Sequence, residues 1–571
     1  MANSNPSTAR TPLLDDSVDT CLDYKGRPVR RSNSGGWRSS SFIIAVEIAE
    51  RFAYYGISSN LIIYLTGPVG ESTASAAAQL NAWSGAVSLL PLLGAFIADS
   101  FLGRYHTIIH SSLIYILGLG LLTLSAILTS VGNSCDQNSD NVTLNSSLRF
   151  HVVLLFFSLY VVALGQGGFK PCVQAFGADQ FDRQDPQECK AQRSFFNWWY
   201  FGLCAGASVT FWILPYIQDN LSWVLGFGIP AILMVVVLVV FVLGTTTYRF
   251  CIKGNEENPF ARIGRVFILA VRNWEMESSE IAADEEAQGT IPTESFNQFK
   301  FLNKALVPPD GSKEQGKVCS ISEVEEAKTV IRLVPIWATS LFYAVAYAQT
   351  STFFTKQGAS MDRSITTGFQ IPAASLQSFI SLVIFLFIPV YDRIFVPLAR
   401  SLTGKPGGIT MLQRIGPGML LSVISMSTAA LVEMRRLKTA QEYGLLDKPN
   451  VIVPMSVWWL VPQYALFGLS EVFTVVGLQE LFYDQVPNEL RSVGLALYLS
   501  ILGVGSFLSS FLISAIEKMT GGDSRDSWFA NNLNRAHLDY FYWLLAALSA
   551  IGLALFLCSA KSYIYARGGA I

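Results

Sequence analysis

The sequence contains few charged residues for its length. Asp, Glu, Lys and Arg make up 14% of the 571 residues, and the formal net charge is −2. A soluble domain of ordinary composition contains about 25% of these residues. This net charge argues for no particular partner, and we predict no nucleic-acid partner. Hydrophobic residues make up 51% of the chain, which is typical of an integral membrane protein.

The motifs of common enzymes and metal sites are also missing. The sequence has no Gly-x-Ser-x-Gly motif and no zinc-protease histidine pair. His106 and His110 are four residues apart, but no third ligand accompanies them. Segment 311–318 is similar to a phosphate-binding loop, but Val318 stands where a magnesium-binding hydroxyl is needed. We therefore predict no catalytic residues, no metal site and no ATP-driven pump.

Long apolar stretches recur along the chain, each long enough to cross a bilayer as a helix. We count twelve such spans, at roughly 42–65, 79–99, 108–132, 150–170, 193–216, 223–244, 329–354, 370–391, 412–433, 455–479, 492–516 and 538–560. The polar residues before the first span contain no signal-peptide core, so we expect no cleavable signal peptide. The sequence thus predicts an all-α, multi-pass membrane protein surrounded by lipid.

The spans form two groups of six, separated by a long polar stretch, which is typical of transporters built from two similar bundles. We predict an N-terminal tail (1–41), an N-terminal six-helix bundle (42–244), a linker (245–328), a C-terminal six-helix bundle (329–560) and a C-terminal tail (561–571). Within the linker, 259–274 and 321–332 have helical, amphipathic patterns. The linker is either a lateral helix that joins the bundles or a simple tether.

The distribution of Lys and Arg predicts that both termini are cytoplasmic. With that orientation, the tails and short loops on the cytoplasmic side hold more basic residues than the external loops. The bias is weakened by basic residues that would lie in the external loop after the ninth span, namely Arg435, Arg436, Lys438 and Lys448.

Three charged residues, Glu47, Glu50 and Arg51, interrupt the first apolar span. Their spacing places them on one face of a helix. A charge inside a membrane is costly unless it is paired or solvated, so a functional role is the default interpretation. Crowded carboxylates can bind and release protons, whereas arginine keeps its proton. The cluster predicts a secondary transporter that uses protons as its coupling ion.

Two further spans contain a single charge. Lys170 ends the fourth span, and it either pairs with Glu47 or Glu50 or extends its side chain to the membrane surface. Glu471 is the one charged residue of the tenth span. It either contacts the substrate or forms a hydrogen bond with a neighbouring helix.

The short segment between the second and third spans combines glycines with charges. Asp99, Gly103 and Arg104 predict a gating loop, and an ordinary capped loop is the alternative. Thr107 stands three residues after Arg104, either as a kinase target or as a helix cap, so a kinase is a candidate partner. Asn141 and Asn145 begin candidate glycosylation sequons in an external loop.

The chain resembles the plant nitrate/peptide transporter family, within the proton-dependent oligopeptide transporters of the major facilitator superfamily. The resemblance extends from about Leu22 to Tyr565. It rests on four motifs, Glu47-x-x-Glu50-Arg51-Phe52-x-Tyr54-Tyr55-Gly56, Gly168-Phe169-Lys170-Pro171, Phe195-Phe196-Asn197-Trp198-Trp199-Tyr200 and Glu480-Leu481-Phe482-Tyr483-Asp484-Gln485-Val486-Pro487.

This resemblance implies alternating access between two six-helix bundles, with proton coupling at Glu47, Glu50 and Arg51 and Lys170 as their partner. Its implied substrate contacts, together with neighbouring polar side chains, give the candidates Tyr54, Tyr347, Ser351 and Glu471. Tyr347 stands where nitrate-binding members carry a histidine, and a neutral tyrosine cannot become a cation. Thr107 falls where members that are switched by phosphorylation carry a threonine.

We therefore predict a proton-coupled symporter of a small polar solute, without another cofactor. Nitrate, di- or tripeptides and a plant metabolite are the candidate substrates. The alternative is a transporter-like receptor that binds a solute without net transport. The plasma membrane and the vacuolar membrane are both open as locations.

Overall fold

The computed structural model shows a protein made mainly of long helices. It describes residues 17–31, 33–135, 144–182, 185–251, 259–274, 299–306, 319–366, 368–403, 409–449, 451–486, 491–521 and 527–563. Residues 275–298 of the predicted linker lie outside these ranges.

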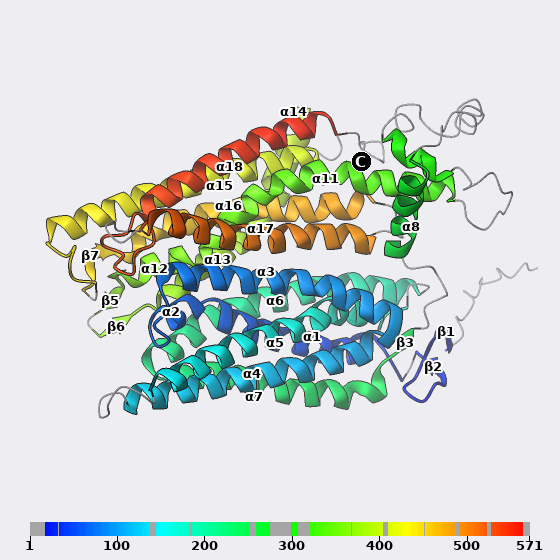
Figure 1. Ribbon diagram of the computed structural model, residues 1–571. Helices are drawn as coiled ribbons and strands as arrows, with labels where there is room; N and C mark the ends of the chain where they lie inside the picture. Colours follow the sequence, from blue (N-terminus) through cyan, green and yellow to red (C-terminus); the bar gives the residue numbers. More distant parts are fainter. Residues whose placement is uncertain are drawn as a thin grey trace, which may run out of the picture.

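The helices form two groups that follow one another in the chain and lie one above the other in Figure 1. The N-terminal group comprises α1 (Gly36–Ser58), α2 (Leu61–Thr66), α3 (Thr73–Ile97), α4 (Arg104–Cys135), α5 (Leu144–Ala178), α6 (Pro186–Asn220) and α7 (Trp223–Leu243). The C-terminal group comprises α11 (Ile321–Tyr347), α12 (Phe353–Ala359), α13 (Ser378–Val390), α14 (Val396–Thr403), α15 (Met411–Glu442), α16 (Val461–Asp484), α17 (Arg491–Thr520) and α18 (Leu538–Lys561). We call these groups the N-bundle and the C-bundle.

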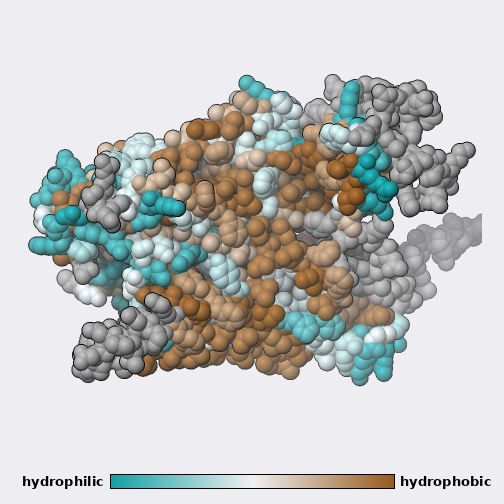
Figure 2. Space-filling view, viewed as in Figure 1, coloured by the Kyte–Doolittle hydropathy of each residue, from teal (hydrophilic) through white to brown (hydrophobic). Residues whose placement is uncertain are grey.

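Eleven helical segments of the described chain are long and apolar enough to cross a membrane. The first predicted span is different, because α1 has 23 residues but carries Arg38 besides the three predicted charges. It nevertheless packs against α6 and α7 within the N-bundle, so that it completes the twelve spans. Figure 2 shows hydrophobic side chains over the middle of the molecule and hydrophilic ones at its two ends, as a membrane requires.

The two bundles meet mainly along α3 and α17. A Cβ atom built on Gly85 would lie 2.7 Å from the Phe507 ring, and one on Gly503 would lie 2.6 Å from the Leu89 side chain. These two glycines therefore allow the helices to approach closely. A hydrogen bond of 2.9 Å between Asn81 and Ser509 joins the same helices.

Two predicted spans are interrupted. α1 ends at Ser58 and the chain resumes as α2 at Leu61, whereas the sequence predicts one helix over 42–65. α11 ends at Tyr347, and the short helix η5 (Ala348–Thr350) leads into α12. Both interruptions lie toward the same end of the molecule, which we call the α2–α12 end (Figure 1).

The ninth span is longer than predicted, and this corrects the placement of Arg436. α15 continues to Glu442, so Arg436 lies within the helix instead of in an external loop. Its side chain is fully buried and makes two hydrogen bonds to Glu433, of 2.9 and 2.6 Å. The carboxylate satisfies a charge that would otherwise be costly to bury, which allows the helix to include it.

Part of the linker packs against the C-bundle. Helix α8 (Pro259–Arg272) and the turn η3 (Lys300–Leu306) share an apolar cluster with the first turns of α11. Arg262 lies 2.8 Å from Glu326, and Arg265 lies 2.6 Å from Glu323. The predicted helices at 259–274 and 321–332 are thus confirmed, the second as the start of α11.

Short strands lie beyond the ends of the helices. β1 (Ser17–Leu22) pairs antiparallel with β2 (Pro28–Arg30) and with β3 (Phe250–Cys251), and we call this side of the molecule the β1–β3 end. Near the α2–α12 end, β4 (Met361–Asp362) runs parallel to β7 (Val453–Ser456), and β5 (Ser364–Thr366) forms a hairpin with β6 (Phe369–Gln370).

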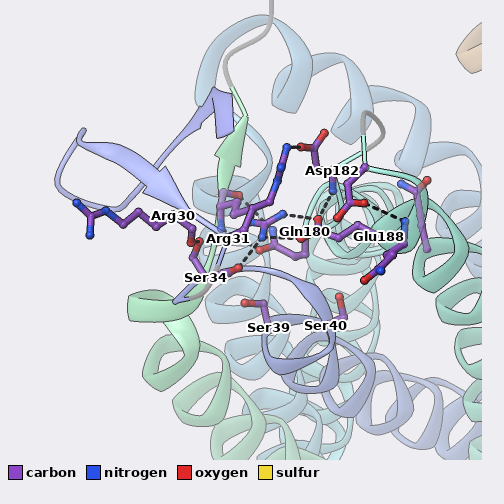
Figure 3. A network of polar contacts seen from close by, with 12 residues as sticks. Arg30, Arg31, Ser34, Ser39, Ser40, Gln180, Asp182 and Glu188 are labelled. Carbon is purple, nitrogen blue, oxygen red and sulfur yellow. Dashed lines mark hydrogen bonds and ion pairs between the residues drawn. The ribbon is translucent and has the colours of Figure 1, made fainter. Parts of the chain in front are cut away.

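A polar network fixes the β1–β3 sheet to the start of α1 and to the loop between α5 and α6 (Figure 3). Arg249 is buried, and its guanidinium donates to both carboxylate oxygens of Glu188, at 2.6 and 3.0 Å. Arg31 donates to Asp182 at 2.5 Å, and this hydrogen bond raises the pKa of the Arg31 guanidinium above its usual value. Gln180 accepts from the backbone N–H of Arg249 at 2.8 Å. The network holds the helix that carries the predicted proton-coupling residues.

Candidate functional site

The three charges of the first span form one buried cluster on α1. Nε of Arg51 lies 2.9 Å from Oε1 of Glu47 and 3.3 Å from Oε2 of Glu50. The exposed fractions of the three residues are 3% for Glu47, 0% for Glu50 and 8% for Arg51. Glu47 lies four residues before Arg51, one helical turn away, and Glu50 directly precedes Arg51. One arginine thus faces two carboxylates away from bulk solvent.

The cluster has spare capacity for a proton. Oε2 of Glu47 is buried and accepts no hydrogen bond from any described residue. Oε2 of Glu50 likewise has no hydrogen-bond partner among the described residues, whereas its Oε1 accepts from Nε2 of Gln166 on α5 at 2.5 Å. The sequence analysis did not select Gln166 as a site residue. A buried glutamine beside Gly165 and Gly167 in an apolar helix was the signal that could have found it.

Lys170 lies on α5 and is half-buried. Its charge interacts with those of Arg51, Glu50 and Glu47, so it belongs to the same electrostatic neighbourhood. It forms no ion pair with a described carboxylate, so the predicted pair with Glu47 or Glu50 is not made in this conformation. The neighbouring Gly167 packs α5 against α3, since a Cβ atom there would lie 2.7 Å from Cβ of Leu90.

The candidate substrate contact on α1, Tyr54, is aromatic, and so is its neighbour Tyr55. Tyr54 stacks on Trp83 of α3, with ring centroids 5.9 Å apart, and Tyr55 packs against Phe211 of α6 at 5.1 Å. Trp83 is fixed in place by a hydrogen bond of 2.8 Å from its indole N–H to the Leu159 carbonyl. These packed aromatic rings lie next to the charged cluster of α1.

The C-bundle contributes Tyr347 and Glu471. The Tyr347 ring lies 6.0 Å from Phe467, which is one turn before Glu471 on α16. Glu471 is half-buried, interacts electrostatically with Tyr347 and Tyr55, and has no hydrogen-bond or ion-pair partner among the described residues. Since Tyr55 belongs to the N-bundle, the structure brings residues of both bundles together.

Ser351 lies just beyond Tyr347, where α11 is interrupted. It is half-buried, and its backbone N–H donates to the Gln349 carbonyl at the end of η5. Its position next to the interruption is compatible with the predicted substrate contact.

The predicted gating loop is a tight turn between α3 and α4. Asp99 lies in a π-helical turn, η1 (Ala98–Leu102), and Gly103 follows with φ of 73°, which favours glycine. Arg104 forms a hydrogen-bonded ion pair with Asp179, which follows α5. The loop is thus tied to another helix of the N-bundle.

Thr107 is buried in the first turns of α4, and its hydroxyl donates to the Gly103 carbonyl at 2.8 Å. This is a hydrogen bond to the carbonyl four residues earlier and not a helix cap, and phosphorylation of Thr107 stays a prediction. Of the two sequons, Asn141 lies outside the described residues. Asn145 lies in the first turn of α5, and glycosylation at both stays a prediction.

A second buried charged cluster, absent from the sequence-based candidates, lies in the C-bundle. Glu433 accepts from Arg436 and also from Gln357 of α12, at 2.7 Å. Arg436 donates further to the Asn534 side chain at 2.9 Å and to the Leu533 carbonyl at 2.7 Å. The pattern Glu-x-x-Arg at 433–436 was the available signal. Because every charge is paired, this cluster is suited to holding α12 and α15 together.

Comparisons with known proteins agree with the motifs. A sequence model of the POT family matches residues 105–529. The Arabidopsis thaliana protein NRT1/PTR FAMILY 5.10 is 64% identical over 559 residues, which cover 98% of each chain. NRT1/PTR FAMILY 5.14 of the same plant is 57% identical over 563 residues, covering 98% of this chain and 99% of that protein.

Solved structures share the fold. An auto-inhibited POT family peptide transporter has a TM-score of 0.70 at 23% identity, covering 92% of this chain and 97% of that chain. A POT family transporter in complex with 5-aminolevulinic acid has a TM-score of 0.62 at 17% identity, covering 92% and 96%. The fold is therefore that of a major facilitator transporter with two six-helix bundles. Since the family match spans most of the chain and the plant relatives cover nearly all of it, this protein belongs to the POT family of membrane transporters, among its plant NRT1/PTR members.

Proposed function

We propose that this protein is a proton-coupled symporter of a small polar solute and works by alternating access between the N-bundle and the C-bundle. The observation that carries the proposal is the buried cluster of Glu47, Glu50 and Arg51 inside a membrane helix. Unpaired charge in such a place is costly, and two acids that share one arginine can accept a proton without leaving an isolated charge.

The proton would act through Arg51. With both acids ionised, Glu47, Glu50, Arg51 and Lys170 sum to zero charge. Protonation of either acid removes one of the two partners of Arg51 and leaves the group with a net positive charge. That charge favours the arrival of an anionic group of the solute and a rearrangement of α1 against α5. The spare oxygen of Glu47 is a natural acceptor for the proton.

The solute class follows from two charges on opposite bundles. Lys170 on α5 and Glu471 on α16 have no ion-pair partner among the described residues. A small solute with one anionic and one cationic group would neutralise both. Di- and tripeptides meet this requirement, as does 5-aminolevulinic acid, which a POT relative binds. Nitrate would engage only Lys170 or Arg51, because Tyr347 cannot supply a cation.

The conformation is closed at the α2–α12 end, which supports this end as one of the two gates. Gln377 of the turn η6 (Ala373–Gln377) donates to the Ser59 carbonyl at 2.9 Å, and the Thr73 N–H donates to Asn531 at 3.0 Å. Between described residues, no hydrogen bond or ion pair joins the bundles at the β1–β3 end. We place the β1–β3 end and both termini in the cytoplasm, following the distribution of basic residues.

We propose the plasma membrane or the vacuolar membrane as the location. On this orientation Asn141 and Asn145 would be external glycosylation sites. A kinase that modifies Thr107 would need a conformation other than this one, because the hydroxyl is buried and bonded here. We propose no catalysis and no cofactor besides protons.

Uptake into proteoliposomes tests the proposal. Purified protein should accumulate dialanine or 5-aminolevulinic acid, used as zwitterionic probes, when an inward proton gradient is imposed. Collapse of the gradient with a protonophore should stop accumulation. Binding of a probe without flux under any gradient would support the alternative, a solute receptor. Accumulation that ignores the gradient would contradict proton coupling.

A further inference from the structure

The two interrupted helices touch each other across the bundles. α2 continues the first helix of the N-bundle, and α12 continues the first helix of the C-bundle, so they hold corresponding positions. In transporters built from two repeats, such interruptions lie on the substrate pathway. α2 and α12 are in contact in this structure, which makes their contact a candidate gate.

One hydrogen bond joins the two segments directly. Nζ of Lys356 on α12 donates to Oγ1 of Thr66 on α2 at 2.7 Å. The Thr66 hydroxyl gives its own proton to the Ile62 carbonyl at 2.8 Å, so its lone pairs are free to accept from the lysine. The ammonium therefore reaches across the seam between the bundles to a neutral acceptor.

Lys356 has no carboxylate partner among the described residues. Arg363 is the neighbouring cation that does find one, and it lies 3.7 Å from Asp219 of the N-bundle. Buried or half-buried cations are normally paired with an acid, since desolvation is otherwise uncompensated. Across the bundles, and among the described residues, Lys356 bonds only to a neutral hydroxyl, so stabilisation of the fold does not explain its position.

A second bond supports the same contact. Gln377 donates to the Thr355 hydroxyl at 2.9 Å, next to Lys356, as well as to the Ser59 carbonyl at the end of α1. The bond to Ser59 joins the end of the first N-bundle helix to the C-bundle, whereas the bond to Thr355 stays within the C-bundle and fixes the Gln377 side chain next to Lys356. The Gln377–Ser59 and Lys356–Thr66 bonds must both break if the α2–α12 end is to open.

We propose that Lys356 and Thr66 form a reversible latch that closes the α2–α12 gate, with the neutral hydroxyl keeping the closed state weak enough to open in every cycle. This inference rests on the proposed transport function. A carboxylate in place of Thr66 would form a buried ion pair with Lys356, which is much harder to break. The identity of residue 66 thus sets how readily the gate opens.

Accessibility of an introduced cysteine tests the latch without any substrate. Ile63 lies half-buried on α2, and Ile63→Cys can be labelled with a membrane-impermeant maleimide in right-side-out and in inside-out vesicles. Thr66→Val, which removes only the hydroxyl, and Lys356→Met should each raise the labelling rate from the external side by about tenfold. The double variant should add nothing further, because both changes break the same bond.

Thr66→Asp and Thr66→Asn form a matched pair. The aspartate should lower labelling below that of the wild type by creating an ion pair, whereas the isosteric asparagine, which can still accept from Lys356, should leave it nearly unchanged. Lys438→Met serves as a charge control, since that side chain on α15 is 77% exposed. Equal labelling of the aspartate and asparagine variants, or wild-type labelling of Thr66→Val and Lys356→Met, would overturn the latch.

The two proposals fail in different ways. Labelling reports the gate even if neither zwitterionic probe is transported, so loss of the transport proposal leaves the latch result readable. If the Thr66→Asp protein does not insert into the membrane, the labelling rates of the Thr66→Val and Lys356→Met variants still test the latch. If proton-driven uptake is observed but the labelling rate is the same in all variants, the transport proposal stands and the latch proposal is wrong.

Discussion

Gln166 on α5 donates a hydrogen bond of 2.5 Å to Glu50 on α1, and this contact links the charged cluster of α1 to the helix that carries Lys170. Arg51 holds the other oxygen of Glu50 at 3.3 Å. Oε2 of each acid has no hydrogen-bond partner among the described residues, but Glu50 is also held by a second helix through Gln166. The two acids are chemically alike but differently restrained, which allows them different parts in the transport cycle.

Glu50→Gln should abolish proton-driven uptake and leave the protein folded. The amide keeps the shape of the carboxyl and can turn its carbonyl oxygen toward Gln166, but it cannot release a proton. Exchange of labelled for unlabelled probe needs no net proton movement and should survive. Accumulation by this variant that depends on pH as in the wild type would remove Glu50 from the coupling mechanism.

Lys170→Ala should nearly abolish uptake while barely changing the melting temperature. The lysine makes no ion pair with a described carboxylate in this conformation, so its removal costs little stability here. Transport is lost because the cluster of Glu47, Glu50 and Arg51 no longer has Lys170 as a second cation in the conformations that bind the solute. Lys170→Arg should restore part of the uptake, since its planar guanidinium differs in shape. Normal uptake by Lys170→Ala would mean that the lysine only extends to the membrane surface.

Tyr347→His should strengthen nitrate transport, most at acidic pH. A protonated imidazole offers a charged hydrogen bond of about 1.5–3 kcal/mol, and about 1.4 kcal/mol changes affinity tenfold, so a gain of one to two decades is expected. Nitrate-evoked currents in the wild type should be absent or require high concentrations. A wild type that saturates at micromolar nitrate would show that another group, such as Arg51 or Lys170, binds the anion.

Arg436→Met should destabilise the C-bundle strongly. It leaves the fully buried Glu433 without its arginine, which costs about 3–5 kcal/mol for a buried pair. The double variant Glu433→Leu with Arg436→Met should be more stable than either single one, because no charge is left alone. The melting temperatures of the variants in detergent measure these differences in stability. The adjacent Arg435 stacks on Trp459 at 4.0 Å, and Arg435→Met is the control, expected to have a small effect. Equal melting temperatures for the two arginine variants would contradict a structural role for the buried pair.

The sequence by itself determined the membrane character, the number of spans and the charged cluster in the first span. These features depend on composition and on sequence spacing, which are local: Arg51 meets Glu47 and Glu50 because it lies four residues after the first and directly after the second on one helix. The amphipathic helix at 259–274 followed from periodicity for the same reason.

Only the tertiary structure decided which residues meet across helices. Gln166 reaches Glu50 over 116 positions and Lys356 reaches Thr66 over 290, and no spacing rule relates such pairs. The hydropathy pattern predicted that Arg436 lies in a loop, because a charged residue lowers the hydropathy of a candidate span whether or not it is paired. The partner, Glu433, is contributed by the same helix, but burial of the pair depends on Gln357 and Asn534 from other segments. Desolvation penalties are properties of the packed bundle, so the chain order alone does not reveal where charges are tolerated.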